Sequence, residues 1–408
     1  MSELYLAFCA VGAAVLVLAL FSRPVERSLF SGPMLMVGLG VILGPTATGL
    51  LDPSRWGDPN TILEEAARLT LAIALMGIAL RLPPGFFRRR WRSLLVLLGA
   101  GMPLMWLASS LLSYWLLEIP ILLALLIGAI ISPTDPVVAS SIVTGTVAEQ
   151  NLPERLRHLI SAESGSNDGL AYPLVLLPIL LMTRPEATVW SEWLTGPVLK
   201  EVGGAIVIGI VIGLAAGYGF RKAEALHAME KTSLLAYTLA LSLLALGLGK
   251  LLHVEGILAV FVAGLAFDHM VSDRDRVQEE NIQEAVNNFF TLPVFGLFGL
   301  MLPWGQWAEL GWRGIALCVA ILLLRRIPAL LALRRGIPLL TAARDAWFVG
   351  WFGPIGVAAL LYATLAVHRT GEELAWTAGS LVVFASILAH GATAAPFAFG
   401  YGRPTKEG

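Results

Sequence analysis

Long apolar runs are the feature that most restricts how this chain can fold. Thirteen such runs of about 17–25 residues, the length that spans a bilayer, follow one another along the sequence. They lie near residues 4–21, 29–50, 62–80, 93–115, 120–145, 156–182, 197–219, 232–251, 254–270, 287–302, 312–333, 345–366 and 376–398. Only 14% of the residues are charged, against roughly 25% in soluble domains. We therefore predict an all-α integral membrane protein with about thirteen transmembrane helices, forming one membrane domain over residues 1–408.

Basic residues predict the orientation of these helices. When the loops between the runs are numbered in order, the odd loops and the C-terminal tail hold nineteen Lys and Arg residues, and the even loops hold four. Loops rich in Lys and Arg stay in the cytoplasm. The sequence thus predicts a multi-pass protein of the plasma or inner membrane, with its N-terminus outside and its C-terminus in the cytoplasm.

The net charge and one polar stretch add two smaller expectations. The formal net charge is -1, so nothing indicates a nucleic-acid partner. Residues 271–286 form the one strongly polar stretch of the chain, and we expect an amphipathic surface helix or a linker there.

The first group of polar residues within an apolar run lies at 131–137. Pro133 and Pro136 cannot both sit in an unbroken helix, because each removes a hydrogen-bond donor and clashes with the preceding turn. We expect extended backbone here, which is tolerated at membrane depth where it lines a cavity enclosed by protein. Asp135 within this break either only neutralises a half-helix N-terminus or, like Thr134, also touches an ion.

The second group lies at 161–173, in the sixth run. Helical spacing makes Ser164 and Asp168 neighbours on one stripe, and Glu163 and Asn167 neighbours on an adjacent stripe. Carboxylate, amide and hydroxyl oxygens are the ligands that hard cations prefer. The pattern favours a cation site; the alternative is a polar helix end with solvated acids near the surface.

Two arginines and one further acid also lie in or beside apolar runs. Arg325 and Arg326 carry permanent charges, so one could extend to the cytoplasmic surface while at least one pairs with a buried carboxylate, for which Glu163 is the candidate. Glu255 stands near the start of another run. It either serves ion access or is solvated at the membrane interface.

At these residues the chain resembles the monovalent cation:proton antiporters of the NhaP-like sodium/proton exchanger type. The likeness rests on Thr134-Asp135-Pro136, on the Glu-Ser-x-x-Asn-Asp-Gly pattern over 163–169, on the glycine- and proline-containing segment 351–359, and on 31–45. The hydrophobic pattern extends the likeness over nearly the whole chain.

The resemblance implies an NhaA/NhaP-like antiporter fold with two inverted six-helix repeats. The fifth and twelfth spans would be broken and would cross, with breaks at Pro133/Pro136 and at Gly353/Pro354. Such repeat-related breaks mark transporter sites. It further implies transport helices at about 93–182 and 312–398, scaffold helices at about 4–80 and 197–302, and a homodimer.

The resemblance also implies roles for individual residues. Asp168 would bind the cation and the proton, with Ser164 and the Thr134 carbonyl as further ligands. Asn167 would orient Glu163, and Glu163 would pair with Arg326, or with Arg325 in reserve. Two positions depart from many relatives, since Ile355 replaces an arginine and 74–79 lacks an acid, and these leave cation selectivity and pH dependence open.

The expected function is secondary antiport of Na⁺, K⁺ or Li⁺ against H⁺ across the bilayer, without enzymatic activity and without a cofactor. One carboxylate shared by cation and proton predicts electroneutral exchange with alternating access. A sodium-coupled symporter of an organic anion is the main alternative, and a channel or a membrane sensor are weaker ones, since no symmetric filter and no signalling domain is evident.

Overall fold

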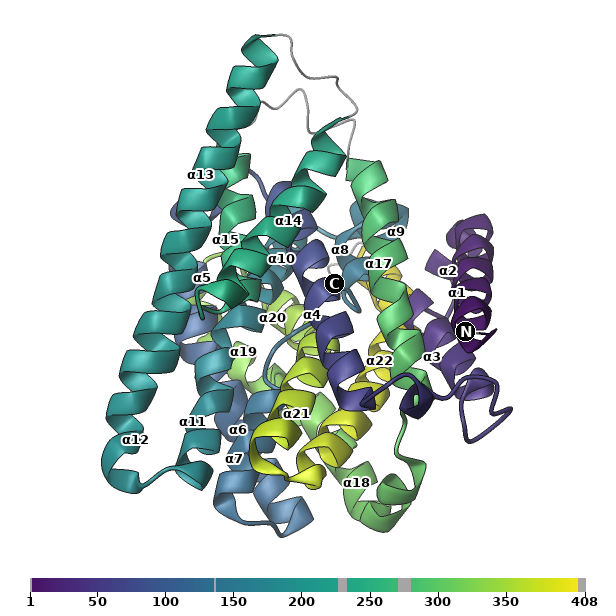
Figure 1. The fold of residues 1–408 in the computed structure, drawn as a ribbon. Helices are drawn as coiled ribbons and strands as arrows, with labels where there is room; N and C mark the ends of the chain where they lie inside the picture. The colour runs from purple at the N-terminus through teal and green to yellow at the C-terminus, as the bar shows by residue number, and fades with distance from the viewer. Residues whose placement is uncertain (1, 136, 227–232, 271–279, 403–408) are drawn as a thin grey trace, which may run out of the picture.

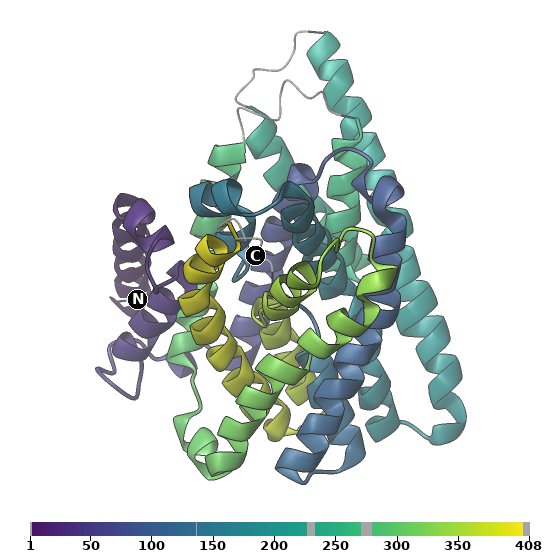
Figure 2. The same cartoon turned by 180° about the vertical axis from the view of Figure 1, so that it is seen from behind.

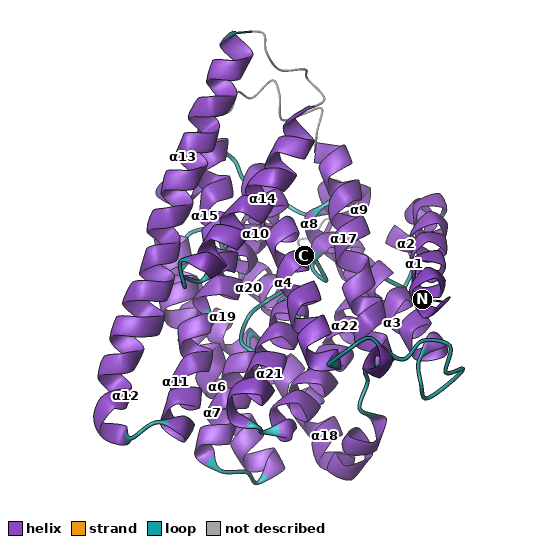
Figure 3. Ribbon diagram, viewed as in Figure 1, coloured by secondary structure: helices purple, strands orange, loops and turns teal. Residues whose placement is uncertain are grey.

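The computed structural model describes residues 2–135, 137–226, 233–270 and 280–402. Within these ranges every regular element is a helix (Figures 1 and 3). The helices are α1 Ser2–Leu20, α2 Ser22–Glu26, α3 Gly32–Leu43, α4 Pro59–Arg81, α5 Phe86–Val96, α6 Met102–Leu117, α7 Ile121–Ile130, α8 Ser140–Val143, α9 Gly145–Asn151, α10 Glu154–Leu170, α11 Tyr172–Thr183, α12 Glu186–Trp193, α13 Gly204–Ala225, α14 Ser233–Leu251, α15 Gly256–Asp268, α17 Glu280–Leu300, α18 Trp304–Leu324, α19 Ile327–Leu333, α20 Ala343–Trp351, α21 Val357–Thr370 and α22 Glu373–Gly402. The expected all-α class is thus confirmed.

A helix or a pair of consecutive helices lies at each predicted apolar run. Among the described residues, six helical stretches are long and apolar enough to cross a bilayer. They are 86–117, 154–183, 186–225, 234–251, 304–336 and 373–402. Shorter apolar helices such as α3, α7 and α15 stand at other predicted runs. The chain therefore has the helices of a multi-pass integral membrane protein, whereas the number of thirteen spans stays a prediction.

Two predictions fall outside the described residues. Pro136, one of the two prolines expected to break the fifth span, is not described, and neither are residues 271–279 of the polar stretch.

One long helical stretch defines the two ends of the molecule. α12 and α13 are joined by the π-helical turns Leu194–Gly203 into one stretch of 40 residues, which is about 60 Å at 1.5 Å per residue. We call the end where α12 starts the α12 end; α7 and α18 also start there, at the bottom of Figure 1 and again in Figure 2. The opposite end, where α13 finishes, is the α13 end.

Two helices are interrupted inside the protein. The backbone between α7 and α8 leaves the helical path at Ile131, close to Pro133, and the backbone between α20 and α21 is unwound over 352–356. Prolines at both places remove a hydrogen-bond donor and prevent a continuous helix. Both expected breaks are therefore present, at Pro133 and at Gly353/Pro354.

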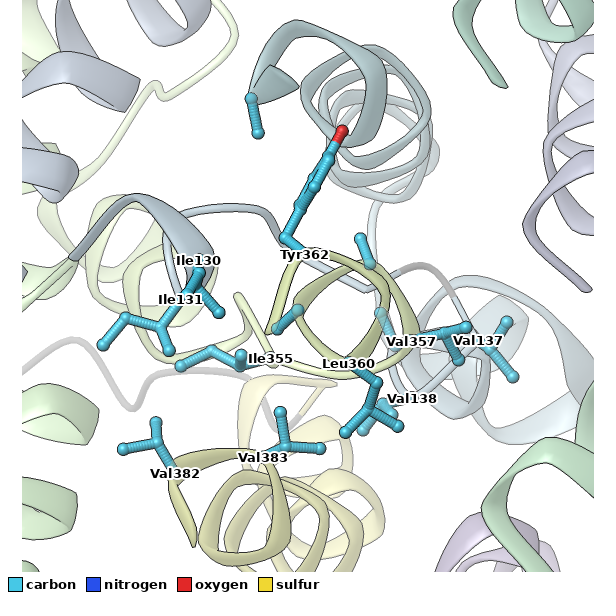
Figure 4. Packing of buried hydrophobic residues seen from close by; sticks show 14 of the residues in the cluster. Ile130, Ile131, Val137, Val138, Ile355, Val357, Leu360, Tyr362, Val382 and Val383 are labelled. Atoms are coloured by element: carbon cyan, nitrogen blue, oxygen red, sulfur yellow. The ribbon is translucent and has the colours of Figure 1, made fainter. Parts of the chain in front are cut away.

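The two breaks are packed in an apolar shell. Side chains from both interrupted helices and from α22 belong to one buried cluster, shown around α21 in Figure 4. α10 passes through the interior, because its residues from Leu159 to Gly169 are all buried. The polar residues of the second sequence motif therefore lie inside the protein, and the alternative of a solvated helix end is wrong.

Candidate functional site

The two unwound segments contact each other. The backbone N–H of Asp135 donates to the carbonyl oxygen of Pro354 at 2.7 Å. Four broken helix ends therefore converge at one place, and their unpaired backbone groups need partners there.

Asp135 supplies partners for the N–H groups. Its Oδ1 accepts from the N–H of Val137 at 2.6 Å and of Val138 at 2.8 Å, and its Oδ2 accepts from the N–H of Val357 at the start of α21. A carboxylate is stabilised at helix N-termini by these donors and by the helix dipole. A side chain at Gly356 would collide with this carboxylate, since a Cβ there would lie 2.3 Å from Oδ2. The geometry favours the capping interpretation of Asp135 over direct ion binding.

Arg325 supplies partners for the carbonyl groups. Its guanidinium donates to the carbonyl oxygens of Ile131, Ser132 and Pro133 beyond α7, and to that of Gly353 beyond α20. These carbonyls lie at the C-terminal ends of α7 and α20, where the helix dipole favours a cation. The resemblance offered Arg325 as a reserve partner for Glu163. This prediction is wrong, because the Arg325 guanidinium donates to backbone carbonyls instead.

Arg326 and Glu163 form a buried ion pair. Two parallel hydrogen bonds of 2.6 and 2.7 Å join the guanidinium nitrogens to the two carboxylate oxygens, and Arg326 Nε donates to Val349 O at 2.9 Å. Both residues are nearly inaccessible, since Arg326 is 2% exposed and Glu163 is 1% exposed. Two-point pairing of this kind is the strongest arrangement for such a pair, and it leaves the Glu163 charge compensated.

Asn167 does not lie where the resemblance suggested. Its Nδ2 donates to Thr134 Oγ1 at 2.7 Å, and its Oδ1 accepts from the Thr134 N–H at 3.1 Å. The role of orienting Glu163 is therefore wrong for this arrangement, because the amide is used to hold the unwound segment. The Thr134 hydroxyl also lies 3.0 Å from that of Ser164. Thr134 is therefore held by two residues of α10, one on each of the two polar stripes.

Asp168 differs from every other acid in this region. It has no exposed surface, and neither carboxylate oxygen has a hydrogen-bond partner among the described residues. Only its backbone is engaged, since Tyr362 of α21 donates its hydroxyl to the Asp168 carbonyl oxygen; Figure 4 shows the Tyr362 oxygen pointing toward a neighbouring helix. A buried ionised carboxylate without a partner is strongly unfavourable. Asp168 therefore needs a proton or a bound cation.

A cavity borders the first break. It has a volume of 160 Å³ and is lined by Val137, Val138 and Ser140 on one side and by Glu26 and Pro33 on another. Val137 and Val138 are the residues whose N–H groups bind Asp135. The cavity thus ends beside the crossing of the two breaks.

Three further polar residues were not singled out from the sequence. Tyr362 is described above, and His390 Nε2 lies 2.8 Å from Trp351 O, at the end of α20. Ser386 Oγ accepts from the N–H of Ile355, at 2.7 Å. Ser386 and His390 stand four residues apart in an apolar helix, a pattern that could have marked them as partners for freed backbone groups.

Glu255 is the acid for which the sequence offered two interpretations, ion access and solvation at the membrane interface. It is only 4% exposed and caps the start of α15, accepting from the N–H of Ile257 and Leu258. The interpretation of an acid solvated at the membrane interface is therefore wrong.

Comparisons with known proteins find relatives that match nearly the whole chain. The family described as "Sodium/hydrogen exchanger, transmembrane" matches residues 11–400. The Na(+)/H(+) antiporter 2 of Zygosaccharomyces rouxii is 34% identical over 388 residues, which are 91% of this chain and 48% of that protein. The Na(+)/H(+) antiporter of Schizosaccharomyces pombe is 31% identical over 416 residues, covering 95% of this chain and 89% of that protein.

A solved structure shares the fold. The sodium proton antiporter MjNhaP1 from Methanocaldococcus jannaschii, at pH 8, aligns with a TM-score of 0.73 and 18% identity over 98% of both chains. The chain spans 38% to 56% of the length of the first three curated relatives that it matches. From the family match over residues 11–400, the chain belongs to the sodium/hydrogen exchanger family.

Proposed function

We propose that this protein is a secondary antiporter that exchanges Na⁺ or K⁺, with Li⁺ as a further candidate, for protons. The observation that carries the proposal is the Asp168 carboxyl group, which is fully buried and has no hydrogen-bond partner among the described residues. Such a group can be occupied by a proton or by a cation, but not by both, and this competition couples the two fluxes.

The neighbouring oxygens complete a cation site at Asp168. Ser164 lies one helical turn before Asp168, and its hydroxyl retains a free lone pair beside Thr134. The Thr134 N–H and hydroxyl are held by Asn167, which leaves the Thr134 carbonyl as the group that can turn toward the ion. Freed carbonyls at helix breaks serve as cation ligands.

The exchange is electroneutral in this proposal. The Glu163 charge is compensated by Arg326, and the residue before Asp168 is the neutral Asn167. One uncompensated carboxylate carries one cation in one direction and one proton in the other. A current across a voltage-clamped membrane during exchange would contradict this stoichiometry.

The architecture behind this mechanism is the NhaP-like arrangement of thirteen spans in two inverted six-helix repeats. The α7–α8 and α20–α21 breaks are the equivalent elements, and both receive an acid at their N–H side and Arg325 at their carbonyl side. Residues 93–182 and 312–398 move against 4–80 and 197–302, and the latter form the homodimer contact. With the N-terminus outside and the C-terminus in the cytoplasm, the α13 end faces the cytoplasm.

Reconstituted vesicles test the proposed function. A pH-sensitive dye is enclosed, a proton gradient is imposed, and Na⁺, K⁺ or Li⁺ is added in turn. We expect a cation to collapse the gradient in the wild-type protein and to have no effect with Asp168→Asn. If no cation moves protons at any pH, the antiport proposal is wrong.

A further inference from the structure

Glu255 is an acid whose position calls for more than a capping role. Its carboxylate accepts from the N–H of Ile257 at 3.3 Å and of Leu258 at 2.5 Å, at the start of α15. Asp, Asn and Ser are the residues that usually fill such a position, because their short side chains reach the backbone directly. A longer glutamate is not required for the cap alone.

The turn that carries Glu255 lies deep in the protein. The N–H of Glu255 donates to the carbonyl oxygen of Glu201 at 3.1 Å. Glu201 belongs to the long helical stretch that starts at Glu186, and fifteen residues at 1.5 Å each place it about 22 Å from the α12 end. Glu255 is therefore buried far from either end of that stretch.

Glu255 lies beside the end of α10 that carries Asp168. Gly169 directly follows Asp168, and a Cβ atom at Gly169 would be 3.0 Å from Glu255 Oε2 and 2.6 Å from Leu258 Cβ. The start of α15 thus packs directly against the end of α10, which brings the Glu255 carboxylate next to the residue that follows Asp168. The Tyr362 hydroxyl donates to the carbonyl oxygen of Asp168 at this same end of α10.

A further acid continues this arrangement toward the α12 end. Tyr172 lies at the start of α11, one turn beyond Asp168, and donates its hydroxyl to Glu201 Oε2 at 2.6 Å. Tyr172 and Glu201 are only partly buried. The side chains of Asp168, Tyr172, Glu201 and Glu255 therefore stand on neighbouring turns, and those of Tyr172 and Glu201 are the more exposed. The cavity beside Val137 and Val138 is lined by other elements, among them α2, α3 and α8.

We propose that Glu255 is a second, side-specific carboxylate of the transport path, which the monovalent cation meets between Asp168 and the α12 end. The proposal rests on the antiport function proposed above and assigns to one face of the protein its own ion-binding residue. Glu255 then receives the cation when the path is open toward the α12 end, and Glu201 with Tyr172 forms the approach to it.

Two variants separate the charge of Glu255 from its capping role. Asp and Asn are both good capping residues and have nearly the same size, so Glu255→Asp keeps the cap and the charge whereas Glu255→Asn keeps only the cap. The apparent KM for Na⁺ is measured by cation-dependent proton flux in right-side-out and in inside-out membrane vesicles. Size-exclusion chromatography checks that each variant is folded.

Relative to Glu255→Asp, we expect Glu255→Asn to raise the KM for Na⁺ measured from the face at the α12 end by about tenfold or more. Loss of a supporting ligand has an effect of this size at other ion sites. The KM from the other face should change little. Equal KM values for the two variants on both faces would overturn the proposal while leaving the antiport function intact. A wild-type protein without any cation-dependent proton flux would overturn both.

A measurement on the wild-type protein covers the case in which Glu255→Asn does not fold. A hydrophobic carbodiimide reacts with protonated buried carboxyl groups, and the labelled residues are located by peptide mass spectrometry. We expect labelling of Glu255 that saturating Na⁺ suppresses. Labelling of Glu255 that is the same with and without Na⁺, or absent in both, would contradict a role in the ion path.

Discussion

Two neighbouring regions of the interior treat buried charge in opposite ways. At the crossing of the two breaks, Asp135 accepts from three backbone N–H groups, Arg325 donates to backbone carbonyls on both segments, and Arg326 is paired with Glu163. A short distance away on α10, Asp168 is equally buried, and its carboxylate has no partner among the described residues.

This difference separates the charges at the crossing from the acid that we propose to bind the cation. The charges that hold the broken helix ends together are compensated by protein groups and need no exchangeable partner. A carboxylate without a partner is stable only when something mobile neutralises it. Burial alone therefore does not distinguish Asp168 from Asp135 and Glu163, whereas the missing hydrogen bonds of its carboxyl group do.

The largest expected effect comes from breaking the paired region at Glu163. Glu163→Gln leaves Arg326 buried without a counter-charge, which costs about 3–5 kcal/mol of stability. Thermal unfolding of the purified protein in detergent should show a clearly lower midpoint. The matched control is the double variant Glu163→Met with Arg326→Met, which removes both charges and should recover much of the loss; a double variant no more stable than the single one would argue against the pairing.

Neutralising Asp168 should have the opposite effect, with transport lost and stability retained. Asp168→Asn removes a buried charge that has no protein partner, so stability should be unchanged or higher. Cation-dependent proton flux should fall by about 100-fold or more, because the ligand itself is lost. A large drop in the unfolding midpoint with Asp168→Asn would mean that this acid is structural after all.

The equivalent substitution at the crossing, Asp135→Asn, is expected to lower the stability of the protein. In Asp135→Asn the amide oxygen can still accept from Val137 and Val138, but the NH₂ group would face the N–H of Val357, donor against donor. An unsatisfied buried donor costs about 1–3 kcal/mol. The unfolding midpoints of Asp135→Asn and Asp168→Asn, measured side by side, should therefore differ, and equal midpoints would remove the distinction between the two acids.

The smallest effect is expected where the two regions meet, at Thr134. Thr134→Val removes the hydroxyl that binds Asn167 and Ser164, and the matched control Thr134→Ser retains it. Loss of each of these two hydrogen bonds is worth about 1 kcal/mol, and we expect the apparent KM for the cation to rise several-fold. Flux measurements should find Thr134→Ser close to the wild type, and a valine variant indistinguishable from it would show that Thr134 is not positioned through its hydroxyl.

Part of this picture follows from the sequence. The need for a partner predicts that Glu163 meets an arginine of the 312–333 run, because neither charge is tolerated alone in an apolar span. The prolines predict the breaks for an equally local reason, the loss of a backbone donor. Both arguments depend on residue types and on little else.

The remainder depends on tertiary packing. Arg325 and Arg326 are adjacent and chemically identical, so only the folded chain decides which one reaches Glu163 and which one reaches the carbonyls. Asn167 could serve either Glu163 or Thr134 from the same helical face. Glu255 begins an apolar run and was expected to be solvated there in one interpretation, but the turn before α15 meets the middle of a 40-residue helical stretch instead of its end.

The most direct test of the central claim is a count of the protons released when a cation binds. Isothermal titration calorimetry of Na⁺ or K⁺ binding, repeated in two buffers of different ionisation enthalpy, gives that number. The account predicts about one proton released per bound cation when Asp168 is initially protonated, and no specific binding to Asp168→Asn. Unchanged cation binding to Asp168→Asn, or binding to the wild type that releases no protons at any pH, would contradict it.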